Sequence, residues 1–305
     1  MKQSSLLQFL AQPVMPEKMK IVDLFCGLGG FSCGAKQAGH QVFLAVDNDK
    51  QLLKCHKDNN PQCIHICQEL PAHLPLPKSG LWHLHGSPPC TKLSIMKNEK
   101  DKNEIKHALN LVSWFLDLAT TCGATSWSME QVVHKDVIHE LEIRKRKNPL
   151  KFDFECIDAV DYNVPQYRKR VIAAPPFLIA NLRFHSGNKK KRLSVRDIIP
   201  KAPRQYLRNT LYNRPDPKTG KSVQVLLKDK IRCIDKPSYT ILATGHIKWA
   251  DAEGKVFRYV LAKERALIQT FPLNYILPKR ETFARIGVGN AVPPQLAKIL
   301  MTSCV

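Results

Sequence analysis

Short apolar runs alternate with more polar segments along the first part of the chain. Residues 20–25 are apolar and β-branched, and a glycine-rich turn joins them to a helix-compatible segment that stops at Gly39. A second apolar run, residues 42–46, stops at Asp47. Apolar runs of this length between breakers are typical of strands, and the segment between them is typical of a helix. The pattern therefore predicts strand, turn, helix and strand, as in an α/β fold.

Three further runs are strand-like and end beside polar residues. Residues 81–84 lead into a Gly-Ser-Pro-Pro-Cys segment, and residues 126–132 carry Glu130 near their end. Before the apolar residues 171–174, the alternation of a strand puts Gln166, Arg168 and Arg170 on one face. A solvated glutamate and a basic strand edge are the plain alternatives for these two features.

Cys90 ends the Gly-Ser-Pro-Pro-Cys segment and has the setting of a nucleophile. Each proline fixes its own φ and biases the preceding residue towards extended geometry, so the thiol leaves the strand in one direction. A buried cysteine in a proline-rich turn is the alternative. The sequence predicts a presented thiol.

The glycines after residue 25 have the setting of a ligand-binding turn. Glycine lets backbone approach a ligand closely, and a helix N-terminus offers free N–H groups. Asp47 lies about 20 residues past the glycines, where nucleoside-binding α/β folds hold ribose hydroxyls. The spacing differs from the dinucleotide fingerprint and favours a nucleoside without a pyrophosphate. A simple tight turn is the alternative.

Together these segments resemble the cytosine-C5 DNA methyltransferase family. Six motifs occur in the family's order and span nearly the whole chain. They are residues 23–30 for the cofactor loop, Pro88-Pro89-Cys90 for the nucleophile, Glu130-Gln131-Val132, Gln166-x-Arg168-x-Arg170, Glu264 to Pro272, and Gly289 to Pro294.

The resemblance implies a DNA (cytosine-5-)-methyltransferase. Its fold would be a doubly wound, mostly parallel sheet, the S-adenosylmethionine-dependent methyltransferase fold, with a second, smaller target-recognition domain. The implied domains are a tail (1–18), a catalytic and cofactor-binding domain (19–182), a target-recognition domain (183–260) and a C-terminal return (261–305). Within the return, residues 261–271 and 295–301 are predicted helices, and the last is implied to pack beside the glycine loop.

The resemblance also implies the chemistry. Cys90 would add to C6 of a flipped cytosine, with Glu130 at N3 and Arg168 at O2, and the Arg168/Arg170 strand would favour the thiolate. S-adenosyl-L-methionine would be the methyl donor. The implied cofactor-binding residues are Phe25, Gly27, Leu28, Gly29, Gly30, Asp47, Pro89, Asn290 and Val292.

Several positions depart from the family pattern. Thr91 and Leu93 stand where glutamine and phenylalanine are usual, and Gln131 replaces an asparagine. Asn48 follows the ribose carboxylate where an aromatic often stacks on adenine, and no acidic residue is expected near Gln68 to hold the adenine amino group. Cofactor affinity is therefore less certain to follow the family than catalysis.

The charge distribution favours DNA as the partner. The net charge is +21, and between Arg183 and Arg232 fifteen lysines and arginines face three acids. This stretch is rich in proline and asparagine and is predicted to be turn-rich and not helical. We expect it to face double-stranded DNA. The predicted contacts are Ser94, Lys189, Lys190, Lys191 and Arg192, whereas the run from Arg144 to Lys147 is predicted to be a charged helix end.

Composition limits the setting of the protein. The 305 residues contain 44% hydrophobic residues, no run of 18 apolar residues and no secretory leader. We expect a soluble intracellular monomer, in the nucleus if eukaryotic and in the cytoplasm if bacterial or viral in a bacterial host. The ten cysteines are expected to be reduced. Cys55, Cys63 and Cys67 lack paired spacing and a matching histidine pair, so no metal site is expected.

The N-terminal tail carries one short motif. Residues from Gln3 to Leu10 resemble the peptide that binds replication sliding clamps, with Leu10 where an aromatic is usual. A short amphipathic helix docked on its own domain is the alternative. Two other functions for the chain stay open: an RNA (tRNA) cytosine-5 methyltransferase, and a catalytically weak DNA-binding regulatory protein of the same fold.

Overall fold

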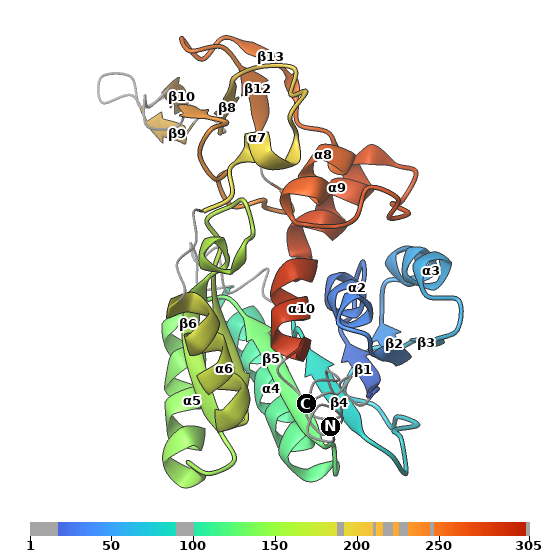
Figure 1. Cartoon of the computed structure of the whole chain (residues 1–305). Helices are drawn as coiled ribbons and strands as arrows, with labels where there is room; N and C mark the ends of the chain where they lie inside the picture. Colours follow the sequence, from blue (N-terminus) through green and yellow to red (C-terminus); the bar gives the residue numbers. More distant parts are fainter. Residues whose placement is uncertain are drawn as a thin grey trace, which may run out of the picture.

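A computed structural model describes most of the chain (Figure 1). The described residues are 18–89, 101–187, 192–209, 212–215, 222–225, 231–244 and 247–302. Cys90, Ser94 and Lys189 to Lys191 lie outside them, as does the clamp-like tail. The predictions for these residues therefore remain predictions.

A seven-stranded sheet organises the larger part of the molecule. Its strand order is β3-β2-β1-β4-β5-β7-β6; neighbouring strands are parallel from β3 to β5, and β7 is antiparallel to both β5 and β6. The strands are β1 (Lys20–Leu24), β2 (Gln41–Asp47), β3 (Ile64–Cys67), β4 (Trp82–Gly86), β5 (Ser126–Gln131), β6 (Asp153–Asp158) and β7 (Lys169–Ala174). The predicted mostly parallel sheet is confirmed.

Helices cover both faces of this sheet, which explains its apolar strands. Ile21 and Val22 are neighbours in β1 and both are fully buried, because the two faces are covered. One face packs against α4 (Asp101–Thr121) and α5 (Lys135–Lys147). The other packs against α2 (Gly30–Gln37), α6 (Pro176–Gly187) and α10 (Pro294–Thr302), with α3 (Lys50–Asn59) beside β2.

The C-terminal helix packs directly on the helix after the glycine turn. A Cβ atom at Gly34 of α2 would lie 2.2 Å from the carbonyl oxygen of Pro294, so only glycine allows this approach. The implied packing of the chain's end beside the glycine loop is confirmed. The helix begins one residue earlier and ends one residue later than the sequence predicted.

A second, smaller sheet forms the other end of the molecule (Figure 1). Its strand order is β11-β8-β12-β13 and all neighbours are antiparallel. The remaining elements are η1 (Ala159–Tyr162), α7 (Val195–Ile198), β8 (Tyr206–Arg208), β9 (Tyr212–Pro215), β10 (Ser222–Val225), β11 (Ile231–Cys233), β12 (Lys248–Ala250), β13 (Val256–Tyr259), α8 (Ala262–Ile268) and α9 (Glu281–Asn290).

One hydrophobic cluster joins the two parts. Trp249 and Ile241 of the smaller part pack with Val288 of α9 and with Leu28 of the glycine turn. Helices α8 and α9 lie between the two sheets (Figure 1). The wall of the glycine turn is therefore built partly from residues more than 200 positions away in the chain.

Two sequence expectations about helices need correction. The stretch from 183 to 232 was expected not to be helical, but α6 continues through Gly187 and α7 spans four residues. Leu178, Ile179 and Leu182 bury one face of α6, and its start lies in the apolar segment before the charged one. The helix expected over residues 261–271 ends at Ile268, and α9 was not predicted.

Candidate cofactor and catalytic site

A cavity of about 600 Å³ opens at the carboxyl end of the large sheet. It lies where the strand order reverses, because β1 is flanked by β2 on one side and β4 on the other. Open α/β sheets bind ligands at such a switch point. Walls come from the ends of β1, β2, β4 and β5 and from α4 and α9.

The turn after β1 is held open by a carboxylate. Asp47 accepts hydrogen bonds from the backbone N–H groups of Gly27 and Asp49, each at 2.8 Å. Phe25 and Gly27 have φ values of 57° and 50°, so the chain turns sharply into the cavity wall. Burial raises the pKa of Asp47. Asp47 is half-buried, and a carboxylate with free lone pairs in such a place favours further hydrogen-bond donors, such as hydroxyl groups.

Two glycines of this turn have different roles. A Cβ atom at Gly30 would lie 2.1 Å from the carbonyl oxygen of Val292, so Gly30 allows the C-terminal motif to reach the cavity. Gly29 has a φ of 87°, and a Cβ atom there would lie 2.6 Å from the ring of His56. Gly30 lines the cavity with Val292, whereas Gly29 faces α3 instead.

Of the nine predicted cofactor-binding residues, only Gly29 does not line the cavity. The structure brings the other eight together from four separate stretches of the chain. They are Phe25, Gly27, Leu28, Gly30, Asp47, Pro89, Asn290 and Val292. Their roles as cofactor ligands remain a prediction.

An acidic residue does stand beside Gln68. Glu69 lines the cavity together with Gln68 and Asn48, which corrects the expectation that no acid lies near this wall. Glu69 directly follows Gln68 in the sequence, so this acid was visible there and was overlooked, and the structure places it, exposed, at the cavity wall.

Sequence reasoning also missed the wall formed by α4. Glu104, His107, Ala108 and Leu111 line the cavity. Their spacing of three, one and three residues is that of one helical face, which is the signal that a helical reading of this segment would have used.

The loop that precedes Cys90 is braced from the neighbouring strand. The Gln131 side chain donates to the carbonyl oxygen of Pro88 at 3.0 Å and accepts from the backbone of Val132 at 2.7 Å. Both ends of the amide are used, so glutamine fills the place where the family usually has asparagine. Pro88 and Pro89 line the cavity at this point.

A chain of histidines and serines also reaches this loop. His83 lies 2.7 Å from the hydroxyl of Ser126 and 2.8 Å from that of Ser128. His85 lies 2.8 Å from Ser128 and 2.9 Å from Ser87, which lines the cavity. The contacts link the interior of β4 and β5 to the residue three positions before Cys90.

Both histidines of this hydrogen-bonded series, His83 and His85, are neutral. Burial lowers the pKa of His83 to about 3 and that of His85 well below its usual value. Phe31 stacks on His85 with ring centroids 3.5 Å apart and an interplanar angle of 3°. A neutral, stacked and fully bonded imidazole fixes the position of the Ser87 hydroxyl.

Glu130 and Arg170 form a buried pair beside the cavity. Glu130 lines the cavity, and its Oε1 lies 2.8 Å from Nε of Arg170. The N–H does not point at the oxygen, so within the described residues both atoms are buried without a hydrogen-bond partner. Orphaned polar atoms of this kind call for a partner, because leaving them unmet in the interior is costly.

Arg168 lies elsewhere, contrary to its predicted place beside Glu130. Its guanidinium donates to the carbonyl oxygens of Ile241, Gly289 and Ala291 at 3.1 to 3.2 Å. Neither Arg168 nor Arg170 lines the cavity itself, and only Glu130 of this group does. The physical reason is that Arg168 precedes β7, where three distant segments return around its guanidinium and offer it carbonyl oxygens. The residue that the fold brings to Glu130 is Arg170.

The basic segment is partly neutralised where the structure describes it. Arg192 pairs with Asp161 at 2.8 Å, and Arg183 pairs with Glu155 at 2.6 Å. Arg196 pairs with Asp235. The run from Arg144 to Lys147 forms the last turn of α5, which confirms the predicted helix end.

Among the helices of the described ranges, none is long and apolar enough to cross a membrane.

Comparison with known proteins gives a consistent family. The model of the C-5 cytosine-specific DNA methylase family matches residues 19–305. The Type II methyltransferase M.HgiDI of Herpetosiphon aurantiacus is 30% identical over 307 residues, which cover 93% of this chain and 94% of that protein. The Type II methyltransferase M.HindV of Haemophilus influenzae is 26% identical over 321 residues, with 94% and 96% covered.

Solved structures share the fold at lower identity. A mutant of DNMT2 from Spodoptera frugiperda superposes with a TM-score of 0.59 at 18% identity and covers 94% of this chain and 99% of that chain. The methyltransferase EhMeth of Entamoeba histolytica gives 0.59 at 17% identity, with 94% and 98% covered. With the family model matching nearly its whole length, this chain belongs to the C-5 cytosine-specific DNA methylase family and is a DNA cytosine methyltransferase.

Proposed function

We propose that this enzyme methylates a cytosine flipped out of duplex DNA, through a covalent bond between Cys90 and C6 of the base. The C5 carbon of cytosine is a poor nucleophile until a thiolate has added to C6. Addition moves an electron pair towards C5, N3 and O2. C5 then takes the methyl group and loses its proton to water, and the Cys90 thiolate leaves C6 to restore the ring.

The buried ion pair of Glu130 and Arg170 at the cavity is the observation that carries this proposal. Glu130 as an acid would donate a proton to N3, and the Arg170 guanidinium would donate to O2, where negative charge builds. Glu130 lines the cavity, and the buried Arg170 stands against it with Nε 2.8 Å from Oε1. Among the described residues neither atom makes a hydrogen bond of good geometry. A base edge would supply hydrogen-bond partners.

S-adenosylmethionine as methyl donor fits the cavity walls. Asp47 offers a half-buried carboxylate to the ribose hydroxyls, and the exposed Glu69 offers a carboxylate to the adenine amino group. The donor would supply an electrophilic methyl group on a sulfonium. The volume of about 600 Å³ lies within the usual range of small-molecule sites, roughly 300–1,000 Å³.

The remaining proposals concern partners and organisation. We assign residues 183–260 to target recognition, with Ser94 and the run from Lys189 to Arg192 on the DNA backbone. The tail from Gln3 to Leu10 would bind a sliding clamp, and the enzyme would act as a monomer. Substrate flipping follows from the chemistry, because C6 cannot be reached inside a duplex.

The test uses Cys90→Ser. Transfer of a tritiated methyl group to duplex DNA should be abolished, while DNA binding persists, since a hydroxyl is far less ionised than a thiol at neutral pH. DNA carrying 5-fluorocytosine should trap a denaturation-resistant adduct with wild type only. Comparable turnover in the variant would remove Cys90 as nucleophile, and transfer to tRNA but not to duplex DNA would make RNA the substrate.

A further inference from the structure

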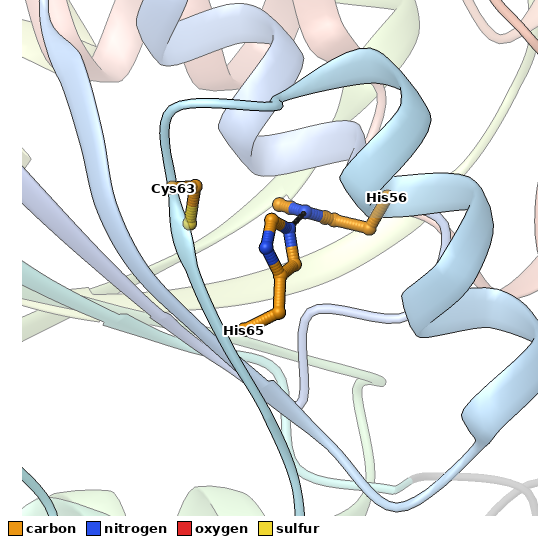
Figure 2. A group of neighbouring side chains, drawn as sticks. All are labelled: His56, Cys63 and His65. Carbon is orange, nitrogen blue, oxygen red and sulfur yellow. Dashed lines mark hydrogen bonds between the residues drawn. The ribbon is translucent and has the colours of Figure 1, made fainter.

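Three side chains with metal-ligating atoms lie together on the far side of the glycine turn from the cavity. They are His56 at the end of α3, Cys63 in the turn that follows, and His65 of β3 (Figure 2). One ligand atom of each lies within 4.8 Å of the other two. We propose that this His56–Cys63–His65 cluster is a zinc site that ties α3 to the edge strand of the large sheet.

The hydrogen-bond partners of His56 leave one of its nitrogens ready for a metal. The hydroxyl of Ser32 donates its only hydrogen to Asp23 at 2.6 Å and lies 3.0 Å from Nε2 of His56. Above about pH 7, where Asp23 is ionised, that hydroxyl can only accept from His56, so Nε2 carries the proton. The lone pair is then on Nδ1, which faces His65. A ligand histidine backed in this way by an acceptor and a carboxylate is the usual outer arrangement of zinc sites.

His65 is left with an unmatched lone pair in either neutral form. Its Nε2 lies 2.8 Å from Nδ1 of His56, and within the described residues its buried Nδ1 accepts no hydrogen bond, although a hydrogen bond to the Cys63 backbone favours a proton on the ring. If Nε2 carries the proton, the lone pair on Nδ1 is unmet. If Nδ1 carries it, two lone pairs face one another. Burial lowers the pKa of His65, which disfavours the imidazolium. A bound cation resolves the second arrangement.

Metal binding would change the protonation of one ligand. Burial lowers the pKa of His56 to about 3, so its ring is already neutral, as ligation requires. Burial and the Asp23 carboxylate raise the pKa of Cys63 to about 12, so the free thiol is protonated. Binding would release the thiol proton to solvent and form the metal–thiolate bond.

The ligand types select among metals. Thiolate with imidazole suits Zn²⁺, whereas Mg²⁺ and Ca²⁺ need oxygen ligands. Nitrogens about 2.0–2.1 Å from a tetrahedral zinc stand about 3.3 Å apart, so the two rings would separate by about half an ångström on binding. Three protein ligands leave a fourth position for water.

The sequence expectation missed this cluster because it looked for a histidine pair in sequence spacing. His56 and His65 come from different elements and meet only when α3 packs against the sheet edge. One compositional signal was present: five cysteines and histidines fall between Cys55 and Cys67, of ten cysteines and eleven histidines in the chain. Helix α3 begins beside Asp47, so the tie would steady a wall of the cavity.

The experiment measures zinc on the purified full-length chain. After removal of metal with a chelator, titration of Zn²⁺ against a chromophoric competitor should give one tight site per chain. Co²⁺ in the same site should show a thiolate charge-transfer band and the visible bands of tetrahedral cobalt. Cys63→Ser and His65→Gln should each weaken Zn²⁺ binding by at least about 100-fold. The exposed neighbour Cys67→Ser is the control and should bind like wild type.

A thermal readout separates metal binding from general damage. The metal-free forms of wild type and Cys63→Ser should unfold at nearly the same temperature, because serine can keep the bond that the Cys63 thiol makes to the Ile64 carbonyl. Zn²⁺ should raise the unfolding temperature of wild type and Cys67→Ser by a few degrees and leave Cys63→Ser unchanged. Absence of one-to-one binding in wild type, or binding unaltered in both Cys63→Ser and His65→Gln, would overturn the proposal.

Discussion

The two sheets of this methyltransferase differ in how far their polar side chains are buried and in whether these side chains are charged. In the large sheet, His83, His85 and Ser128 are fully buried, uncharged and bonded to one another. In the part built around the small sheet, Arg196 and Arg258 are partly exposed and paired with Asp235 and Glu264. Buried neutral groups make stability depend on pH, whereas exposed charges respond to salt. We therefore expect pH to affect mainly the stability of the part around the large sheet, and salt to affect mainly the part around the small sheet.

At the contact between the two parts, a charged side chain is fully buried. Arg168 is a charged side chain with an exposed fraction of 2%, and it donates to Ile241 near the small sheet and to Gly289 and Ala291 before α10. Gln166 also crosses the joint, accepting from the backbone of Ile241 at 3.0 Å. These residues hold the part built around the small sheet against the large sheet.

The largest effects should come from exchanging each arginine for lysine. Arg170→Lys should lower kcat by about 10²–10³-fold, as expected when one donor to a developing negative charge is misplaced, with little change in stability. Arg168→Lys should lower the free energy of unfolding by about 2–4 kcal/mol, because one ammonium cannot reach three separated carbonyls. Steady-state kinetics on both variants measure the loss of kcat, and denaturant unfolding on both measures the loss of stability.

This pair also decides between two assignments of the O2 ligand. If Arg168→Lys, fully folded at low temperature, loses turnover while Arg170→Lys keeps it, the assignment first made from the sequence is restored. The outcome expected from the structure is the reverse, since only Arg170 lies against Glu130.

Asp47→Ala should weaken binding of S-adenosylmethionine by about 10–150-fold. The loss corresponds to about 1.5–3 kcal/mol for charge-assisted hydrogen bonds. Asp47→Asn should lose less, because an amide oxygen still accepts from the backbone of Gly27. Calorimetric titration measures both. Equal affinity in all three proteins would mean that the ribose lies elsewhere in the cavity.

The cofactor side of the site was predictable because backbone geometry determines it. The backbone there is restricted locally by Gly27 and Gly30, by the prolines before Cys90 and by the strand end at Asp47. Local restrictions of this kind can be predicted from the sequence. Eight predicted residues accordingly meet in one cavity.

The rest of the site depends on which strands become neighbours. Residues 83 and 85 alternate with residues 126 and 128 on facing strands, but their bonds exist only because β4 pairs with β5. The same holds for Arg168 and Arg170: alternation showed that both share a face, and the packing of distant segments decided which one meets Glu130. The His56–Cys63–His65 cluster was hidden for this reason too, whereas Glu69, the neighbour of Gln68, was visible in the sequence and was overlooked.

A smaller effect is expected from His83→Gln on the pH dependence of stability. The unfolded chain takes up a proton on this histidine near pH 6.5, while burial keeps the folded one neutral down to about pH 3. Its contribution to stability is thus lost as pH falls from 6.5 towards 3. The variant should reduce this slope by up to about 1.4 kcal/mol per pH unit.

Asp23 changes the pH dependence of stability in the opposite direction, so the slope of the variant must be compared with that of wild type. Its pKa rises from 3.8 to about 7 on folding, so between these values the folded state holds the extra proton and gains stability as pH falls. Urea unfolding of wild type, His83→Gln and the exposed control His139→Gln between pH 5 and 7 isolates the histidine. An unchanged slope in His83→Gln would show that His83 is protonated in the fold.

The smallest effect concerns the charged side of the comparison, the run from Lys189 to Arg192. If it lies along the phosphate backbone, replacing all four residues by alanine should flatten the log–log dependence of duplex affinity on salt by about 0.9 for each lost phosphate contact. Arg192→Ala alone should change the slope less than Lys189→Ala, because Asp161 already partners Arg192 at 2.8 Å. Cognate and random duplex should lose affinity alike, since phosphate contacts do not read bases. The measurement is a fluorescence-anisotropy titration at four or more salt concentrations. If the salt dependence is unchanged after these four residues are neutralised, the DNA-facing surface lies elsewhere. The end of α5, from Arg144 to Lys147, would then be tested next.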